Sequence, residues 1–435
     1  MNIAIVGGGI AGLGAAWALN RHHDITLFEA NDWLGGHAHT VDVPAAGAGT
    51  MPVDTGFLVY NEQTYPHLTR LFDHLGVATE PSDMSFSFTL DGSLEYAGSG
   101  AGFFAQGRNL FRRSHWQMAR DIMRFREIGP ELLEEADDGP LGDLLDRHGF
   151  SVPFQSDYLL PMAAAIWSAR MRDVRGFPAR TFLQFFANHG LISITDRPEW
   201  RTVSGGSREY VSAMSRPFAD RIRLNTPVTS VHRHPDGVRL RLIDDSTEEF
   251  DHVVFASHSD QTLAVLGATA TPMEQKLLGA LRYEQNRAVL HRDPSLMPRR
   301  KRVWSSWNYR TTSTGRADRQ ASVTYWLNRL QSLPDRSPLL LTLNPVIEPA
   351  PELVVDEYRY AHPQFDEAAR DAQRRIVRLQ GANRTWFAGA YLGYGFHEDG
   401  LQSGLNVAAA VGSPAPWFHE VAPVSSAAGS VLLPA

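Results

Sequence analysis

The chain opens with MNIAIVGGGIAGLGAAWALNRHHDITLFEA (residues 1–30), and the order of residue types in this stretch predicts its architecture. Residues 2–6 form a short apolar run that is typical of a buried strand, and residues 24–28 form a second one. A glycine-rich turn and a helix of small residues connect the two runs. A strand, a crossover helix and a second strand predict an α/β fold that is built on a parallel sheet.

The turn carries the pattern G-x-G-x-x-G, formed by Gly7, Gly9 and Gly12, and the helix starts with Ile10 and Ala11. The first glycine permits a tight turn, the second lets a diphosphate approach the backbone, and the third allows close packing of helix on strand. Unpaired N–H groups and the positive end of the helix dipole then face the phosphates. We therefore predict that these five residues bind the diphosphate of a dinucleotide.

An acidic residue follows the second apolar run. Glu29 lies 22 residues after Gly7 and precedes Ala30, and a carboxylate at this spacing accepts hydrogen bonds from a ribose diol. A lone G-x-G-x-x-G pattern is a weak signal, and a chance glycine turn is its alternative. The strand, the helix and the acid together favour dinucleotide binding.

The residues after the acid favour FAD over NAD. They read DWLGGHAHT, and the spacing of Glu29, Gly35, Gly36 and Thr40 resembles the E-x5-G-G-R-x-x-[ST] extension of the flavin amine oxidase and carotenoid desaturase superfamily. The resemblance implies a Rossmann-like FAD-binding domain of the glutathione reductase type, with an inserted α+β substrate domain as in amine oxidases. His37 stands where that superfamily usually has an arginine near the FAD phosphates or ribityl chain, and histidine is a weaker, pH-dependent cation.

Further segments resemble the same superfamily in the same order. Residues 53–60 resemble its D-x-G segment beside the isoalloxazine ring, with a plain turn as the alternative, and residues 203–207 resemble its V-x-G-G element. Residues 386–389 and 395–404 resemble its C-terminal motif, in which a helix N-terminus is directed at the flavin, although Ala390 replaces a common acidic residue. The resemblance implies these further cofactor-binding residues: Gly56, Phe57, Leu58, Val228, Gly389, Glu398, Gly400, Leu401 and Gly404.

These segments predict a discontinuous organisation. The FAD-binding domain is expected to comprise residues 1–75, 200–265 and 380–415, the substrate-binding domain residues 76–199 and 266–379, and residues 416–435 a C-terminal tail. The sequence holds no second G-x-G-x-x-G pattern, so a nicotinamide domain is not expected. Electrons would then leave to oxygen or to another acceptor.

Several stretches resemble a narrower bacterial group of FAD-binding proteins associated with cyclopropane fatty acid synthase-like methyltransferases, whose relatives include a fatty-acyl desaturase. The stretches are residues 164–168, 188–191, 197–203, 304–309 and 395–400. The resemblance implies a lipid or fatty-acyl substrate. The expected reaction is desaturation by hydride transfer to flavin N5, or a flavin-assisted double-bond isomerisation.

Oxidation of a small amine is the main alternative. Amine oxidases carry a lysine on a substrate-domain strand that is followed by an acidic residue and a proline. Aligning that pattern with Asp293-Pro294 of this chain puts Asn286 at the place of the lysine, and neither Lys276 nor Lys301 fits the register. Phe396 likewise replaces a tyrosine of the amine-oxidising relatives. A non-catalytic binding protein on the FAD fold is a further alternative.

Three polar residues are candidates for catalysis near the flavin. They are Asn286, His397 and Tyr60, and for His397 a structural role at a helix start is the alternative. A hydrocarbon substrate requires few titratable groups, because binding mainly has to hold the reacting C–H bond close to N5.

Composition limits the remaining function classes. The chain has 435 residues, which favours two domains, and its net charge of -7 gives no indication of nucleic-acid binding. The absence of cysteine excludes thiolate metal sites and a cysteinyl FAD linkage, so non-covalent FAD is expected. No basic region precedes the apolar N-terminus, so we expect no signal peptide and a cytoplasmic protein.

Residues 103–126 interleave arginines with large apolar side chains. This composition suits peripheral contact with an anionic membrane face, and a helix with solvated arginines is the alternative. The pair His37 and His39 would share one face of a strand, but no further ligands accompany it, so no metal site is predicted. A homo-oligomer is left open.

Overall fold

The computed structural model describes residues 1–45, 49–90, 93–98, 100–167, 171–188, 191–192, 198–311, 321–333 and 337–421. Parts of the stretches 164–168, 188–191 and 197–203 lie outside the described residues, as does the predicted tail beyond Val421. No described helix is long and apolar enough to cross a membrane.

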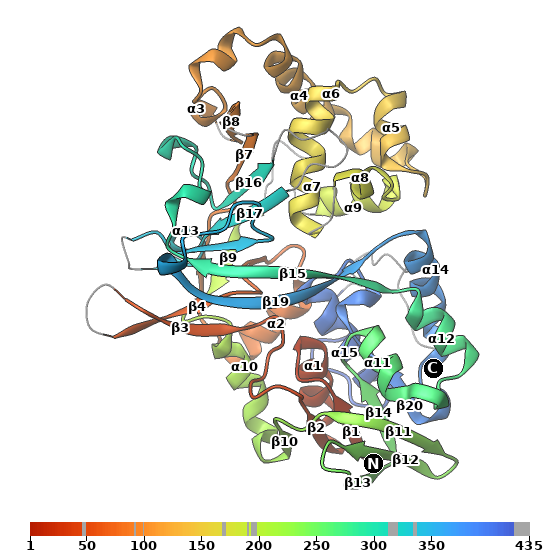
Figure 1. Ribbon diagram of the computed structural model, residues 1–435. Helices are drawn as coiled ribbons and strands as arrows, with labels where there is room; N and C mark the ends of the chain where they lie inside the picture. Colours follow the sequence, from red (N-terminus) through yellow and green to blue (C-terminus); the bar gives the residue numbers. More distant parts are fainter. Residues whose placement is uncertain are drawn as a thin grey trace.

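A five-stranded parallel sheet forms the centre of the part that contains the N-terminus (Figure 1). Residues 3–6 of its first strand are buried on both faces, which explains why the run is continuously apolar rather than alternating. The predicted α/β fold is therefore confirmed. In sheet order the strands are β10 (Ile222–Arg223), β2 (Asp24–Phe28), β1 (Asn2–Val6), β14 (His252–Phe255) and β20 (Thr385–Phe387).

Two helices pack on each other beside this sheet, α1 (Ile10–Leu19) and α15 (His397–Ala410). A Cβ atom on Gly404 would lie 2.1 Å from the carbonyl oxygen of Ala11, so the two backbones touch at this point. Glycine is therefore required for the helices to pack this closely. Helices α2 (Pro66–Leu75) and α10 (Arg208–Ser215) pack around the same pair.

An antiparallel three-stranded sheet adjoins the parallel one, and helices follow it in the chain. Its strands are β11 (Val228–His234), β12 (Gly237–Leu242) and β13 (Thr247–Phe250), and the helices are α11 (Ser259–Leu266), α12 (Pro272–Gly279) and α14 (Glu367–Arg375). Two smaller pairings involve β3 (Thr40–Pro44) with β4 (Thr50–Asp54), and β9 (Trp200–Val203) with β5 (Tyr60–Asn61) and β6 (Thr79–Pro81).

A mixed seven-stranded sheet forms the second part of the molecule. Its order is β19 (Val354–Gln364), β15 (Arg282–His291), β18 (Leu340–Leu343), β17 (Ala321–Trp326), β16 (Trp307–Thr311), β7 (Phe86–Leu90) and β8 (Leu94–Ala97). The long strands β15 and β19 run between the two parts of the molecule (Figure 1).

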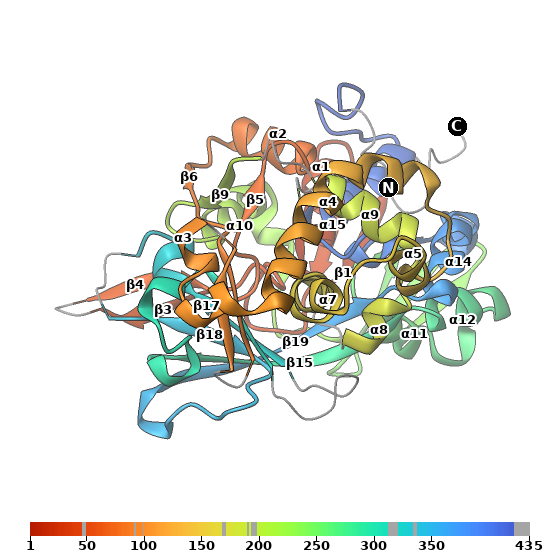
Figure 2. The same cartoon turned by 90° about the horizontal axis from the view of Figure 1, so that it is seen from above.

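Helices cover the seven-stranded part at the end away from the parallel sheet (Figures 1 and 2). A large aromatic and aliphatic core joins these helices to the strands. The helices are α3 (Gly100–Phe103), α4 (Arg113–Glu135), α5 (Leu141–Arg147), α6 (Val152–Phe154), α7 (Leu160–Trp167), α8 (Met171–Arg175) and α9 (Ala179–Asn188).

Candidate active site

The three glycines of the turn between β1 and α1 have different surroundings. The fold requires glycine at two of these positions, and the third faces open space. Gly7 has a φ of 112° and a Cβ there would lie 2.9 Å from the carbonyl of Ala256, while a Cβ on Gly12 would lie 1.9 Å from the oxygen of Gly7. A Cβ on Gly9 would meet no heavy atom within 4 Å. Gly9 is also the N-cap of α1. Because glycine has no side chain to accept from the first amides of the helix, these N–H groups stay available to a ligand in this space.

The carboxylate of Glu29 lies at the edge of this turn. Its Oε2 accepts from the N–H of Gly8 at 2.7 Å and its Oε1 from the N–H of Asn31 at 2.8 Å. The backbone of Glu29 pairs with the segment that enters β11, since the N–H of Thr226 donates to its carbonyl at 2.9 Å. The segment that leads to Val228 at the start of β11 therefore runs beside Glu29 and Ala30.

The Gly35-Gly36 turn packs directly on the glycine-rich turn. The N–H of Gly35 donates to the carbonyl of Gly8 at 2.8 Å, and a Cβ on Gly36 would lie 3.2 Å from Cα of Gly9. The next layer is Gly56, where a Cβ would lie 2.1 Å from the carbonyl oxygen of His37. Residues from three predicted segments are thus brought together.

The side chain of Asp54 holds the segments around Gly56 together. It is 1% exposed, and its carboxylate accepts from the hydroxyl of Thr40 at 2.5 Å and from the N–H and hydroxyl of Ser207 at 2.9 and 2.7 Å. The D-x-G segment and the V-x-G-G element therefore meet at one buried carboxylate. Leu58 continues the segment, and its carbonyl accepts from the hydroxyl of Thr202 at 2.9 Å.

His397 begins α15 and stacks on Phe57, with ring centroids 4.0 Å apart. Its Nε2 lies 2.5 Å from the hydroxyl of Tyr210. Burial lowers the pKa of His397 to about 3 and raises the pKa of Tyr210, so the tyrosine donates and the imidazole is neutral. The proton of the ring is then on Nδ1.

Other predicted residues of the C-terminal motif hold α15 in place. The carboxylate of Glu398 accepts from the N–H groups of His67 and Leu68 at 2.8 and 3.0 Å and so caps α2, and burial raises its pKa to about 8. The N–H of Gly389 donates to Ser403 Oγ at 2.8 Å. At the interface with α1, Gly400 faces Ile10 and Leu401 faces Gly14.

Three histidines gather next to the glycine-rich layer. The ring of His37 lies 5.4 Å from that of His362, 6.1 Å from that of His258 and 5.1 Å from that of Tyr360. Burial and the other imidazoles hold the pKa of His37 well below its usual value, and burial lowers the pKa of His362 to about 4. All three rings are therefore neutral at pH 7, since burial also lowers the pKa of His258.

Sequence reasoning missed His258 and His362, although each carried a signal. His258 follows β14, which lies beside β1 in the parallel sheet, so its position at the carboxyl edge next to the glycine-rich turn was foreseeable. His362 alternates with Tyr360 and Tyr358 along β19, which placed the three side chains on one face.

The predicted catalytic residues occupy different surroundings. Asn286 on β15 is 1% exposed, and its amide bonds His362 Nδ1 at 2.9 Å and accepts from Asn344 at 2.7 Å, which joins it to the histidine group. Tyr60 packs against Tyr65 and Phe72, and its hydroxyl faces Thr79 and Arg201. The catalytic roles of Asn286, His397 and Tyr60 stay predictions.

The surroundings of the start of α1 fit a bound dinucleotide. They provide the amides at the helix start as donors, open space at Gly9 and the carboxylate of Glu29 as an acceptor. In addition, Nε2 of His37 is buried and has no hydrogen-bond partner within the described part of the chain. A buried polar atom without a partner is costly, so a ligand group that forms a hydrogen bond with this nitrogen would be stabilising.

Comparisons with known proteins agree with this geometry. The profile of the family described as "Flavin containing amine oxidoreductase" matches residues 10–266. A Mycobacterium tuberculosis protein, provisionally named the flavin-containing monoamine oxidase AofH, is 24% identical over 398 residues, which cover 88% of this chain and 80% of that protein.

Two solved structures show the same fold at low identity. Putrescine oxidase bound to putrescine superposes with a TM-score of 0.67 at 15% identity, covering 94% of this chain and 99% of that one. A fatty acid isomerase of P. acnes that produces CLA superposes with a TM-score of 0.65 at 14% identity, covering 92% and 96%.

Proposed function

The chain belongs to the family of flavin-containing amine oxidoreductases and is an FAD-dependent oxidoreductase, and we propose that its substrate is a lipid or fatty-acyl chain. Bound FAD supplies the hydride acceptor, either for desaturation or for a double-bond isomerisation that returns the hydride. The residues proposed to hold it are those of the glycine-rich turn, Glu29, the Gly35–His37 turn and the start of α15.

The observation that carries the proposal is the aromatic wall at the start of α15. Phe396 stacks on Phe185 at 4.9 Å, and Phe185 lies 4.6 Å from Trp167 in the large apolar core. Phe185 and Trp167 are buried in that core and Phe396 is half-buried at its edge, so an alkyl chain that reached the start of α15 would cover the apolar ring of Phe396.

The polar groups that an amine oxidase would use are replaced. The resemblance implies that Asn286 takes the place of the lysine of amine-oxidising relatives, and its amide is hydrogen-bonded to Asn344 and to His362. We propose that Asn286 orients the imidazole of His362, and that the neutral ring of His397 offers its Nδ1 proton as a donor. Neither group needs to change charge, which suits a substrate without ionisable atoms at the reacting carbons.

The named relatives support two candidate substrates. A fatty acid isomerase shares the fold, which favours the acyl chain, and putrescine and cyclohexylamine oxidases share it too, which keeps a small amine as the second candidate. In a desaturation two C–H bonds would break: the hydride would pass to bound FAD and the proton to water or to a neutral imidazole of the histidine group, and the electron pair would then leave the flavin to oxygen or to another acceptor.

The test is anaerobic incubation of the flavin-loaded protein with free and phospholipid-bound unsaturated or methylated fatty acids, and in parallel with putrescine and cyclohexylamine. Flavin bleaching that persists until an acceptor is added, with an acyl product two hydrogens lighter by mass spectrometry, supports a desaturase. An acyl product of unchanged mass without net bleaching supports an isomerase. Bleaching by the amines alone would overturn the proposal.

A substitution sharpens the test. Phe396→Tyr adds a hydroxyl to the ring proposed to contact the acyl chain and is expected to lower acyl turnover about tenfold, because substrate binding would then have to remove that hydroxyl from water. Ile243→Ser, on a side chain that is 63% exposed far from α15, is the matched control and should leave turnover unchanged.

A further inference from the structure

A cationic and apolar patch lies at the α3 and α4 end of the molecule, outside the site described above. Residues 96–120 contain four arginines and no acidic residue, and residues 299–302 read Arg-Arg-Lys-Arg. The chain as a whole has a net charge of -7, so this concentration of positive charge is local. The patch is defined here as residues 104–116 with 299–302.

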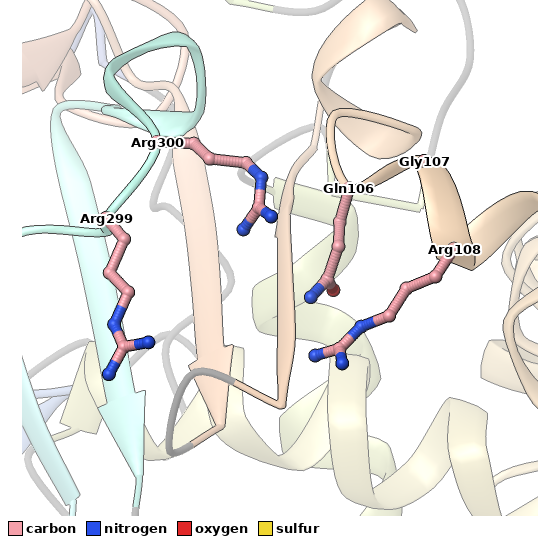
Figure 3. Close-up of a pocket in the computed structure, with 5 residues that line it drawn as sticks. All are labelled: Gln106, Gly107, Arg108, Arg299 and Arg300. Carbon is pink, nitrogen blue, oxygen red and sulfur yellow. The ribbon is translucent and has the colours of Figure 1, made fainter.

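The two segments enclose a cavity of about 540 Å³ that is lined by Gln106, Gly107, Arg108, Arg299 and Arg300. Figure 3 shows Arg300 and Arg108 extending towards Gln106 from opposite sides. Glu95, which is fully buried, accepts from the N–H of Arg299 at 2.9 Å and from the guanidinium of Arg300 at 2.6 Å. This carboxylate fixes the 299–300 turn through the backbone of Arg299 and neutralises the guanidinium of Arg300, so the side-chain charge of Arg299 at the cavity suits a phosphate.

Large apolar side chains project from the same patch. Phe111 is 91% exposed, Trp116 51% and Leu110 48%, all at the junction of a short 3-10 helix, η1 (Gly107–Phe111), with α4. The indole N–H of Trp116 donates to the carbonyl of Leu110 at 2.9 Å, and its ring lies 5.0 Å from that of Phe104. These contacts fix Trp116 against the backbone of Leu110 and the ring of Phe104, so three exposed apolar side chains lie close together in the chain rather than scattered over the surface.

We propose that this patch docks on the surface of an anionic phospholipid membrane. Phe111, Leu110 and Trp116 would enter the interfacial region, while the arginine cavity binds a headgroup phosphate. Charge complementarity selects this partner. The arginines match the anionic headgroups of a bilayer surface, and the exposed aromatic and aliphatic side chains match the acyl region beneath the headgroups. The inference goes beyond the proposed function and does not depend on it, since docking is measured without turnover.

The test is co-sedimentation of the flavin-loaded protein with vesicles of phosphatidylcholine, with and without 30% phosphatidylglycerol, at low and high salt. Binding is expected only with the anionic lipid and is expected to fall at high salt. Arg299→Gln should weaken it about fivefold, from the roughly 1 kcal/mol that one basic residue contributes near such a surface. Phe111→Ser should weaken it about tenfold.

Matched controls come from the opposite end of the molecule, where Figure 1 shows β10, β12 and β13. Arg216→Gln and Ile243→Ser replace an exposed arginine and a 63% exposed isoleucine there and should leave binding unchanged. Equal binding to neutral vesicles, or equal loss in the controls, would overturn the proposal. So would a dimer in solution that Phe111→Ser dissociates while the wild type ignores vesicles, because the occupant would then be a second copy.

Discussion

The three fingerprint glycines should respond differently to the addition of a single methyl group. Gly9→Ala is expected to abolish tight FAD binding while leaving the stability of the cofactor-free protein intact. Gly12→Ala is expected to destabilise the protein itself. The contrast follows from where each Cβ would lie, in open space at Gly9 and 1.9 Å from the oxygen of Gly7 at Gly12.

The magnitudes follow from the same geometry. Gly9 has φ -73° and ψ 179°, which alanine adopts without strain, so its folding free energy should stay within about 1 kcal/mol of wild type. Overpacking at Gly12 should cost about 1–3 kcal/mol. At Gly9 the new methyl group occupies the space before the helix amides, and each hydrogen bond lost to a charged phosphate weakens FAD binding about 10- to 150-fold.

The assay is thermal unfolding of the cofactor-free proteins followed by FAD titration monitored through flavin fluorescence. Gly107→Ala, at a glycine that also faces open space but lies in the arginine cavity, is the control and should change neither quantity. Wild-type FAD affinity in Gly9→Ala would refute the reasoning. So would an apo melting temperature for Gly9→Ala as low as that for Gly12→Ala.

Three further predictions concern buried polar groups. Burial lowers the pKa of His362 to about 4, so as the pH falls this imidazole becomes protonated in the unfolded chain before it does in the folded one. The free energy of unfolding should therefore fall by about 2 kcal/mol between pH 7 and pH 5. Urea unfolding of His362→Gln should lack this contribution, and a pH dependence equal to that of the wild type would contradict the prediction. Asp54→Asn replaces an acceptor of the Ser207 hydroxyl and should lower stability by about 2–3 kcal/mol, which an unaltered apo melting curve would disprove. Tyr210→Phe leaves Nε2 of His397 without its donor and should lower the free energy of unfolding in urea by about 1–3 kcal/mol, and an unchanged unfolding curve would contradict this.

The features predictable from the sequence are those that the chain fixes locally. The turn after β1 and the acid after β2 lie within one continuous unit, so residue spacing alone determined where the amides and the carboxylate of Glu29 would meet. The structure adds that this carboxylate is already held by the N–H groups of Gly8 and Asn31.

The features that could not be predicted depend on strand register and on distant contacts. Asp54 was placed in a segment beside the flavin, yet its role as an anchor for Thr40 and Ser207 requires knowing that residues 153 positions apart in the chain pack together. Likewise, His362 reaches Asn286 only because β15 and β19 pair in the register that sets Glu284 opposite His362. A one-residue slip would direct His362 to the other face.

His37 stands at the position where the resemblance described above implies an arginine, and this affects the charge near the glycine-rich turn. Its imidazole is neutral, and so are those of His258 and His362 around it, because each added proton would be buried and would repel its neighbours. Among the described residues nearest the glycine-rich turn, positive potential therefore comes mainly from backbone amides at the starts of α1 and α15. Since Gly400 packs on Ile10 and Gly404 on Ala11, the packing of α15 on the first turn of α1 sets how the amides at the two helix starts lie relative to each other.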